Sequence, residues 1–451
     1  MDIPGLRTLL LDLNCMTAFR HVMDNPAIAS LIALCVSCVD GSDEEHLTEA
    51  YARCYNAWLE LASKGRGSFA EEALESVLFT ESAAARMCAQ TEALPYSVMS
   101  GMAHDLETLQ RLTSIEPAMF LLLCERAGLP GSAAVRLPVW EPVLRERYRD
   151  ERLSPEMLSR EGAGAVARFF KTHGTGLFAR HMAVTYTGEG ETGLRGIREP
   201  DPICFEEMVG YERQREALLD NTRRLLSGHR AGNVLLYGDK GTGKSASVKA
   251  LLREFFAQGL RMVEVTPQHL THLPALFALL RKQPCRFIVF VDDLAFNDSC
   301  PEYTALKTVL EGGLEARPRN VAVYATSNRR NIVRQSFSER EDDVSVRDTL
   351  EEKFSLSDRF DLRLTFSEPT LPEYFETCRA LLEMRGLTVE QEVLEARARA
   401  FAQSHGGRSP RVARQLCDML EGELAEKAAR EAELARQEEA QQAQGEEGET
   451  P

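Results

Sequence analysis

The chain has 451 residues, of which 44% are hydrophobic and 27% charged, so it is long enough for several domains and apolar enough for a sizeable core. Its formal net charge of −16 argues against a protein that coats DNA or an anionic membrane. Residues 421–451 contribute −7 of this charge, because ten Glu stand against Lys427, Arg430 and Arg436. The rest of the chain is only moderately acidic and has room for a local basic patch.

The start of the chain lacks a basic segment and contains Asp2 and Asp12, so we expect no secretory signal. The longest apolar run, Ile28–Val39, is shorter than the roughly 20 residues that a membrane-spanning helix requires. The 11 cysteines show no disulfide-framework spacing, which is typical of reduced thiols in a cytoplasmic protein. Cys35 and Cys38 form a single CxxC pair, which we interpret as the packed face of a helix. The alternative is a metal or redox site, and a metal would need a second ligand pair.

Residues 1–185 are predicted to form a mostly helical N-terminal domain. Three segments in it repeat apolar residues every three or four positions: Asp43–Lys64, Phe69–Gln90 and Ala118–Ala127. Its histidines stand alone, and no group of chemically active residues assigns it an activity. Residues 186–202 are rich in Gly, Thr, Glu and Pro, which indicates a linker.

Residues 203–367 are predicted to form an α/β domain with a five-stranded parallel sheet. Helix-length segments separate short runs rich in Val, Ile, Leu, Phe or Tyr, namely Asn233–Tyr237, Arg261–Val265, Phe287–Val291, Val321–Thr326 and Leu362–Phe366. This alternation favours a parallel sheet with helices on both faces. The near-continuous apolar run Phe287–Val291 supports it, since both faces of such a strand are buried.

Residues 368–420 are predicted to form a small helical domain. Two capping-box spacings and one Ser-Pro step mark its helix starts: Thr370 with Glu373, Thr388 with Gln391, and Ser409 with Pro410. The tail, residues 421–451, is rich in Ala, Glu and Gln. It should extend the last helix and then fray into disorder.

One segment matches the phosphate-binding pattern GxxxxGK[ST] at every fixed position, and it consists of Gly238, Asp239, Lys240, Gly241, Thr242, Gly243, Lys244 and Ser245. Glycines let the backbone turn tightly, so that successive N–H groups point at phosphate oxygens near the positive end of the next helix. Lys244 would hold the β- and γ-phosphates, and the Ser245 hydroxyl would bind Mg²⁺. An apolar strand before this P-loop and a helical stretch after it favour this interpretation over a glycine turn with an unrelated lysine.

The run Phe287–Val291 ends in two carboxylates, Asp292 and Asp293. A strand parallel and adjacent to the P-loop strand would place Asp292 beside the metal, where it accepts from Mg²⁺-bound water. By itself, a strand that ends in Asp-Asp is equally typical of a helix cap. Together with the P-loop, it predicts a site for a nucleotide with Mg²⁺.

From about Ile203 to Asp418 the sequence resembles the AAA+ ATPases, and within them an uncharacterised bacterial group of predicted ATPases of unknown function. Besides the P-loop, the resemblance is carried by four motifs in the family's order: Asp292–Leu294, Glu311–Pro318, Ala325–Arg330 and Ser355–Phe360. It implies an ATP-binding P-loop core with a small helical lid. It also implies a homo-oligomeric ring or partial ring that hydrolyses ATP at its subunit interfaces.

The resemblance assigns roles to single residues of the core. Met208, Val209 and Gly210, in the segment before the P-loop, would line the adenine pocket. Asn328, at the end of the fourth strand, would sense the γ-phosphate and the attacking water. The alternative for Asn328 is a residue that only closes the strand into a turn.

Two arginines also receive roles from the resemblance. Arg359 would be the finger that a neighbouring subunit inserts, stabilising the charge that develops on the transferred phosphoryl group. Its alternative is an ion pair with Asp358 or Asp361. Arg411, in the first turn of the helix after Ser409, would reach the γ-phosphate from the lid. Its alternative is a solvated residue at the helix start.

Two departures from the family pattern bear on activity. The position after Asp292 is usually Glu, which polarises the attacking water, and here it is Asp293. A carboxylate that sits about 1 Å too far back can slow hydrolysis about 100-fold. The segment Thr266–Pro274 lacks the aromatic-hydrophobic-Gly loop of members that thread polypeptides, which argues against a threading unfoldase.

Three functions are consistent with these residues. The first is an Mg²⁺-dependent ATPase that remodels an unknown protein partner held by the N-terminal helices. The second is an ATP-dependent binding switch or adaptor with little turnover, favoured by Asp293. The third and least favoured is an initiator- or helicase-loader-like ATPase on DNA. Its phosphate contacts would come from arginines around the fourth strand that otherwise form an inter-subunit or solvated face: Arg317, Arg319, Arg329, Arg330 and Arg334.

Overall fold

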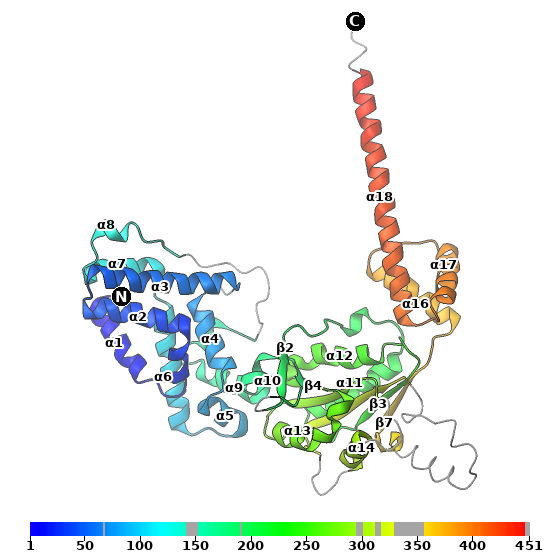
Figure 1. The fold of residues 1–451 in the computed structure, drawn as a ribbon, viewed down its shortest axis with the longest axis horizontal. Helices are drawn as coiled ribbons and strands as arrows, with labels where there is room; N and C mark the ends of the chain where they lie inside the picture. Colours follow the sequence, from blue (N-terminus) through cyan, green and yellow to red (C-terminus); the bar gives the residue numbers. More distant parts are fainter. Residues whose placement is uncertain are drawn as a thin grey trace.

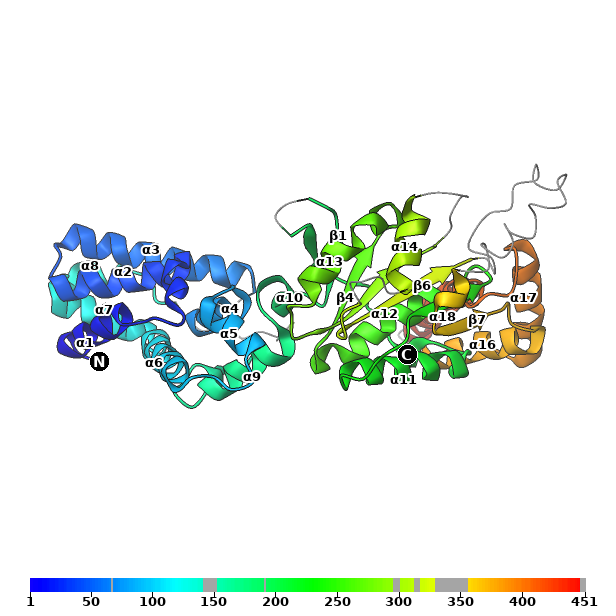
Figure 2. The ribbon, with the colours of Figure 1, turned by 90° about the horizontal axis from the view of Figure 1, so that it is seen from below.

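The computed structural model of the chain describes residues 1–65, 68–140, 152–189, 192–294, 301–311, 317–328 and 356–446. Helices of the N-terminal half lie at one end, a sheet flanked by helices lies in the middle, and three further helices lie at the other end (Figures 1 and 2). Among the described residues, no helix is both long and apolar enough to cross a membrane.

The N-terminal part is helical, as predicted, and its helices share one hydrophobic core that extends from Leu6 to Ala179. Its α-helices are α1 (Ile3–Asn14), α2 (Pro26–Asp40), α3 (Glu44–Ser63), α4 (Phe69–Phe79), α5 (Ala83–Gln90), α6 (Tyr96–Thr113), α7 (Pro117–Ala127), α8 (Gly131–Ala134), α9 (Ala163–His173) and α10 (Gly176–Arg180), with short 3₁₀ turns η1 (Arg20–Asp24) and η2 (Pro155–Met157). Polar N-caps start several of them; Asp43 and Ser68, for example, accept from backbone N–H groups of α3 and α4.

The two cysteines of the CxxC pair lie on the buried face of α2. Cys38 Sγ lies 3.7 Å from Cys124 Sγ of α7. Burial raises the pKa of the Cys35 thiol to about 12, so this thiol stays protonated and packs as a small apolar side chain.

The middle of the molecule is a seven-stranded sheet with the order β2-β1-β4-β5-β6-β3-β7. Its strands are β1 (Ala183–Tyr186), β2 (Leu194–Ile197), β3 (Val234–Gly238), β4 (Leu260–Val265), β5 (Arg286–Val291), β6 (Val321–Ser327) and β7 (Leu362–Phe366). All neighbouring pairs are parallel except β1 with β2, which form an antiparallel hairpin. The five predicted strands are present as β3 to β7.

The strand count and the linker differ from the prediction. Strand β1 pairs with β4 and brings β2 with it, so the sheet has seven strands rather than five, and β2 lies inside residues 186–202. Both strands have only four residues, and β1 follows directly on helical segments, so neither has a recognisable period of its own. Gly188, after β1, and Gly193, before β2, have φ values of +71° and +67°.

The position of β5 also differs from the prediction. We expected the strand that ends at Asp292 to be adjacent to the P-loop strand β3, but β6 lies between them and pairs with both. This insertion does not separate the two motifs. The P-loop leads into the helix α12 (Lys244–Phe255), whose first turn still reaches Asp292.

Helices cover both faces of the sheet, as predicted (Figure 1). Residues of α11 (Glu212–Leu226) and α12 join one hydrophobic core with Leu236 and Tyr324, while α13 (Leu273–Leu280) and α14 (Pro301–Glu311) join the opposite core with Leu235 and Val289. The 3₁₀ turns of this region are η3 (Phe205–Glu207), η4 (Phe256–Gln258), η5 (Pro267–His272) and η7 (Ser357–Arg359). Alternate residues of the central strands therefore face two separate cores, which explains their continuous apolar sequences.

A buried arginine joins the N-terminal helices to the sheet. Arg261 in β4 is 1% exposed, and its Nε donates to the Phe178 carbonyl of α10 at 2.6 Å. Its Nη2 donates to Nδ1 of His173 in α9 at 3.1 Å, and its Nη1 to the Leu260 carbonyl at 2.7 Å. These hydrogen bonds satisfy a charge that would otherwise be costly to bury.

The last three helices are α16 (Leu371–Met384), α17 (Gln391–Ser404) and α18 (Pro410–Glu446), and we call them the lid. Their facing residues form a core of their own. The capping box of Thr370 with Glu373 is present, and the Ser409 Oγ accepts from the backbone N–H of Val412. The prediction for Thr388 is wrong, because α17 begins after Glu390 without a side-chain cap. Helix α18 extends well beyond the lid core (Figure 1).

Candidate functional site

The P-loop forms a tight turn between β3 and α12. Gly238, Gly241 and Gly243 have φ values of +135°, +81° and +91°, which L-residues with a side chain rarely adopt. Gly238 also has no room for a side chain, since a Cβ there would lie 2.1 Å from the Phe366 carbonyl oxygen of β7. The glycines of the pattern are therefore required by backbone conformation and by the neighbouring strand.

Lys244 is buried at the start of α12 and points back into the loop. Its Nζ donates to the carbonyl oxygens of Gly238 at 3.0 Å and Asp239 at 2.6 Å. Burial lowers the pKa of Lys244, and the carboxylates of Asp239, Asp293 and Asp292 oppose this shift. An anion in the loop would compensate the buried ammonium group.

Asp292 lies directly beside the P-loop. The Ser245 Oγ donates to Asp292 Oδ1 at 2.6 Å, and the Thr326 Oγ1 of β6 donates to the same oxygen. The backbone N–H of Asp293 also donates to it, at 3.1 Å. Hydroxyl and carboxylate oxygens are ligands that Mg²⁺ accepts, and it usually takes only a few from protein and the rest from phosphates and water. Ser245 and Asp292 fit such an ion.

Asp293 has an unusual backbone conformation with φ +50°, held by its N–H, which donates to Thr326 Oγ1 at 2.9 Å. The Asn328 Nδ2 donates to Asp293 Oδ1 at 2.7 Å. Two residues that were singled out separately in the sequence thus form one hydrogen-bonded pair at the ends of neighbouring strands β5 and β6.

A cavity of about 450 Å³ opens beside the P-loop, between the sheet region and the lid. This volume lies within the usual range of small-molecule sites, about 300–1,000 Å³. Most of the predicted site residues of the core line it, namely Met208, Val209, Gly210, Lys240, Gly241, Thr242, Gly243, Lys244, Ser245, Asp292, Asp293 and Asn328. The exceptions are Gly238, Asp239 and Arg359. Gly238 and Asp239 shape the loop from outside the cavity wall, and the Asp239 carbonyl accepts from the Thr242 hydroxyl at 2.8 Å.

Residues of α11 and of the segment before it hold the wall opposite the P-loop. Arg215 Nη1 donates to the Met208 carbonyl at 2.6 Å and to the Phe205 carbonyl at 3.3 Å. Tyr211 takes a left-handed conformation at φ +58°, and its hydroxyl donates to the Ser367 carbonyl at 2.6 Å. These contacts fix the backbone where the resemblance places adenine.

The lid completes the cavity with Thr377 and Leu381 of α16 and two arginines of α18. Arg411 lies in the first turn of α18, and its backbone N–H donates to the Gly241 carbonyl at 3.3 Å. Arg414, one turn further on, lines the same cavity. The backbone of Arg411 therefore contacts the P-loop, and the residue lines the cavity.

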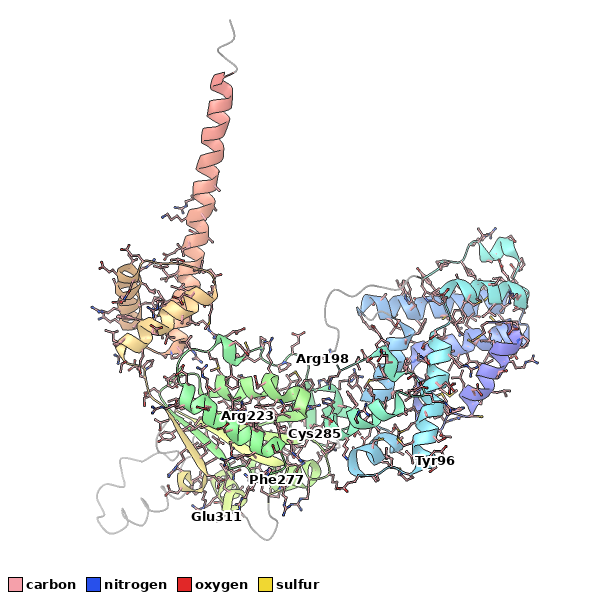
Figure 3. The ribbon with its side chains drawn as sticks, turned by 180° about the vertical axis from the view of Figure 1, so that it is seen from behind. Tyr96, Arg198, Arg223, Phe277, Cys285 and Glu311 are labelled. Atoms are coloured by element: carbon pink, nitrogen blue, oxygen red, sulfur yellow. The ribbon has the colours of Figure 1, made fainter. Side chains whose placement is uncertain are left out.

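Arg359 does not line this cavity. It lies in η7 and forms an ion pair with Glu311 at the end of α14, a residue labelled in Figure 3. Its alternative partners are engaged elsewhere, because Asp358 pairs with Arg363 and Asp361 Oδ2 accepts from the Asn233 N–H at 2.7 Å. Within one subunit, Arg359 is thus apart from the phosphate site.

Of the five arginines predicted to cluster around β6, the structure describes two, and one of these is exposed. Arg317 donates to the Asn233 side chain and to the Ala231 carbonyl, and burial lowers its pKa. Arg319 is exposed. The other three members, Arg329, Arg330 and Arg334, lie outside the described residues.

Several residues of the site escaped the sequence reasoning. Thr326, Tyr211, Arg215 and Arg414 line the cavity without having been assigned a role. Only Thr326 carried a local signal, since it is a polar residue near the end of an apolar strand and inside the motif Ala325–Arg330. The other three lack such a signal, and Tyr211 meets its partner Ser367 only in the fold.

The chain is similar to one protein family and, over a short segment, to one curated protein. The model of a family described as "Protein of unknown function (DUF815)" matches residues 179–424. The ORC1-type DNA replication protein 5 of Halobacterium salinarum is 41% identical over 61 residues, which are 13% of this chain and 14% of that protein. This chain therefore spans only a small part of that relative.

Solved structures give only distant similarities. The RuvB Holliday junction branch migration motor of Thermotoga maritima is 16% identical, with a TM-score of 0.33 over 48% of this chain and 63% of that one. The ORC1 protein of Aeropyrum pernix, solved in complex with DNA, is 19% identical, with a TM-score of 0.34 over 49% of this chain and 61% of that one. The family match covers more than half of the chain, so the chain belongs to the DUF815 family of proteins of unknown function.

Proposed function

We propose that the chain is an Mg²⁺-dependent ATPase that binds ATP in the cavity between the sheet region and the lid. The observation that carries this proposal is the 2.6 Å hydrogen bond between Ser245 Oγ and Asp292 Oδ1 beside the P-loop. This hydrogen bond brings together Ser245 and Asp292, the two metal ligands that the sequence predicts. Mg²⁺ bound there would neutralise charge on the β- and γ-phosphates.

Each residue of the site has its own role in hydrolysis. Lys244 exchanges its bonds to loop carbonyls for bonds to phosphate oxygens, and Arg411 adds a charge from the lid side. Asp293 orients the attacking water, and Asn328, bonded to it at 2.7 Å, holds that carboxylate in place. Lys244 changes its partners when the nucleotide binds, so that the charges are in place before the reaction and little reorganisation accompanies it.

Hydrolysis is completed at a subunit interface. Arg359 lies apart from its own site and is paired with Glu311, and we assign it to the site of a neighbouring subunit. The oligomer is a ring or partial ring in which each lid moves with its nucleotide. The N-terminal helices, joined to β4 through Arg261, transmit this movement to a bound protein partner.

The test is phosphate release by mixed oligomers. Increasing amounts of Arg359→Ala subunits are added to wild type, and activity should fall more steeply than the wild-type fraction because each variant also disables a neighbour. Arg363→Ala is the matched control, since Arg363 lies in the adjoining strand β7 and pairs with Asp358 of η7. A loss proportional to dilution with both variants would refute the interface mechanism.

A binding switch with little turnover is the second candidate, and the Asp293–Asn328 hydrogen bond favours it. In this function the shorter carboxylate is held by Asn328 rather than offered to water, and ATP occupancy repositions the lid. Protein that binds ATP tightly but releases no phosphate would select the switch. Asp293→Glu should then raise the hydrolysis rate, since the longer side chain reaches further into the cavity.

A further inference from the structure

A chain of contacts runs from the P-loop through the hinge to the lid, with Glu368 at its centre. The Glu368 backbone N–H donates to Asp239 Oδ2 of the P-loop at 2.7 Å. The Glu368 side chain accepts from the lid, with Oε1 2.6 Å from the Arg408 backbone N and Oε2 3.3 Å from Arg408 Nη2. One residue between β7 and α16 thus contacts both the phosphate loop and the loop that starts α18.

The lid loop fits closely around this carboxylate. Gly407 has φ +136°, and a Cβ there would lie 2.7 Å from Glu368 Oε1. Gly406 before it has φ +75°. Two successive glycines in left-handed conformations leave this loop little intrinsic preference, so the hydrogen bonds to Glu368 select its conformation.

The same loop sets the position of Arg411. Ser409 packs so tightly on the P-loop that its Oγ lies 2.7 Å from where a Gly241 Cβ would stand. Two residues later, the Arg411 N–H donates to the Gly241 carbonyl at 3.3 Å. A shift of the loop at Arg408 would therefore move both contacts.

We propose that Glu368 is a positioning residue that fixes the lid loop so that Arg411 contacts the γ-phosphate. We call the contacts of Glu368 with Asp239 and Arg408 the hinge latch. This inference rests on the proposed function, since it assigns a means by which the ATP site controls the lid. When the γ-phosphate is lost, Arg411 loses its ligand, and the lid loop keeps only the latch and the contacts of Ser409 and the Arg411 backbone with Gly241. The latch therefore determines how strongly the protein distinguishes ATP from ADP.

The test measures the affinity of the full-length protein for a non-hydrolysable ATP analogue and for ADP. Wild type should prefer the ATP analogue, and Glu368→Ala should reduce this preference by roughly 10- to 100-fold, the worth of a charge-assisted hydrogen bond. Arg411→Ala should reduce it similarly. The double variant should lose no more than either single variant, because the latch acts through Arg411.

The control is Glu423→Ala. Glu423 is a lid carboxylate that does not contact the P-loop. Arg397 Nη1 donates to Glu423 Oε2 at 2.5 Å and lowers the pKa of Glu423, just as the Arg408 contacts lower the pKa of Glu368. It should leave the nucleotide preference unchanged. If Glu368→Ala does not fold, Arg408→Met keeps the backbone bond to Glu368 Oε1 and removes only the side-chain bond, and should give a smaller loss.

The possible outcomes distinguish a failure of the hinge latch from a failure of the proposed nucleotide site. Wild type that binds neither nucleotide would overturn both the proposed function and the latch. Wild type that prefers the ATP analogue, with folded Glu368→Ala and Arg408→Met showing the same preference, would overturn the latch alone. Equal losses for Glu368→Ala and Glu423→Ala would reduce Glu368 to a general stabiliser of the lid and also refute the proposal.

Discussion

Thr326 is expected to position both carboxylates of the site. Its hydroxyl donates to Asp292 Oδ1 and accepts from the Asp293 N–H at 2.9 Å. Thr326→Val keeps the shape of the side chain and removes both hydrogen bonds. A hydrogen bond to a charged group contributes about 1.5–3 kcal/mol, and the Asp293 N–H retains its 3.1 Å contact with Asp292, so the local stability should fall by about 2–3 kcal/mol.

The effect on hydrolysis should be larger than the effect on folding. Without the hydroxyl, Asp292 and the left-handed turn at Asp293 are held by fewer contacts and can shift, and a displacement of about 1 Å can slow a reaction about 100-fold. Hydrogen exchange of the amides in Phe287–Asp293 measures the local stability, and phosphate release measures the rate. Thr326→Ser keeps the hydroxyl and should restore both. Thr326→Val that hydrolyses ATP at the wild-type rate with unchanged exchange would refute the reasoning.

Three further predictions concern the loop, the joint and the hinge. Gly238→Ala places a methyl group against rigid backbone and should lower the free energy of unfolding by about 3 kcal/mol or more. Gly422→Ala, in open space on α18, should raise the free energy of unfolding by about 0.5–1 kcal/mol. Thermal melting measures both variants, and equal melting temperatures would contradict the packing argument. Arg261→Met should loosen the N-terminal helices from the sheet, seen as faster limited proteolysis between α10 and β1 with unchanged ATP affinity; unchanged cleavage would contradict a role as the joint. The Arg408 contacts lower the pKa of Glu368, so its contribution to stability is complete above the carboxyl's ordinary pKa and is lost as pH falls through the lowered value. Unfolding followed between about pH 5 and pH 3 should therefore depend less on pH in Glu368→Gln than in wild type, and identical profiles would contradict the assignment.

The elements of the core could be predicted because their physical causes are local. Strands such as β5 are buried on both faces, so their sequences are apolar throughout, and the predicted bounds agree with the structure within one residue. The P-loop needs glycines at fixed spacing because its backbone has positive φ values at Gly238, Gly241 and Gly243. Burial on both faces of a strand and positive φ values restrict the residue types at given positions, so both can be recognised in the sequence.

Features that depend on distant contacts could not be predicted. The insertion of β6 between β3 and β5 is a property of strand order, which no local pattern encodes. The hinge latch joins Glu368 to Asp239 and Arg408, which are far from it in sequence. Thr388 shows the opposite error, because the capping-box spacing is present in the sequence but α17 begins only after Glu390.

The central claim is that the P-loop, Lys244 and the Ser245–Asp292 pair bind a nucleoside triphosphate with Mg²⁺. Isothermal titration of folded wild-type protein with ATP and Mg²⁺ tests it most directly, with Lys244→Ala as the matched variant. The account predicts saturable binding at one site per chain that Lys244→Ala abolishes. Absence of binding heat with wild type at several temperatures, or equal affinity in Lys244→Ala, would contradict it.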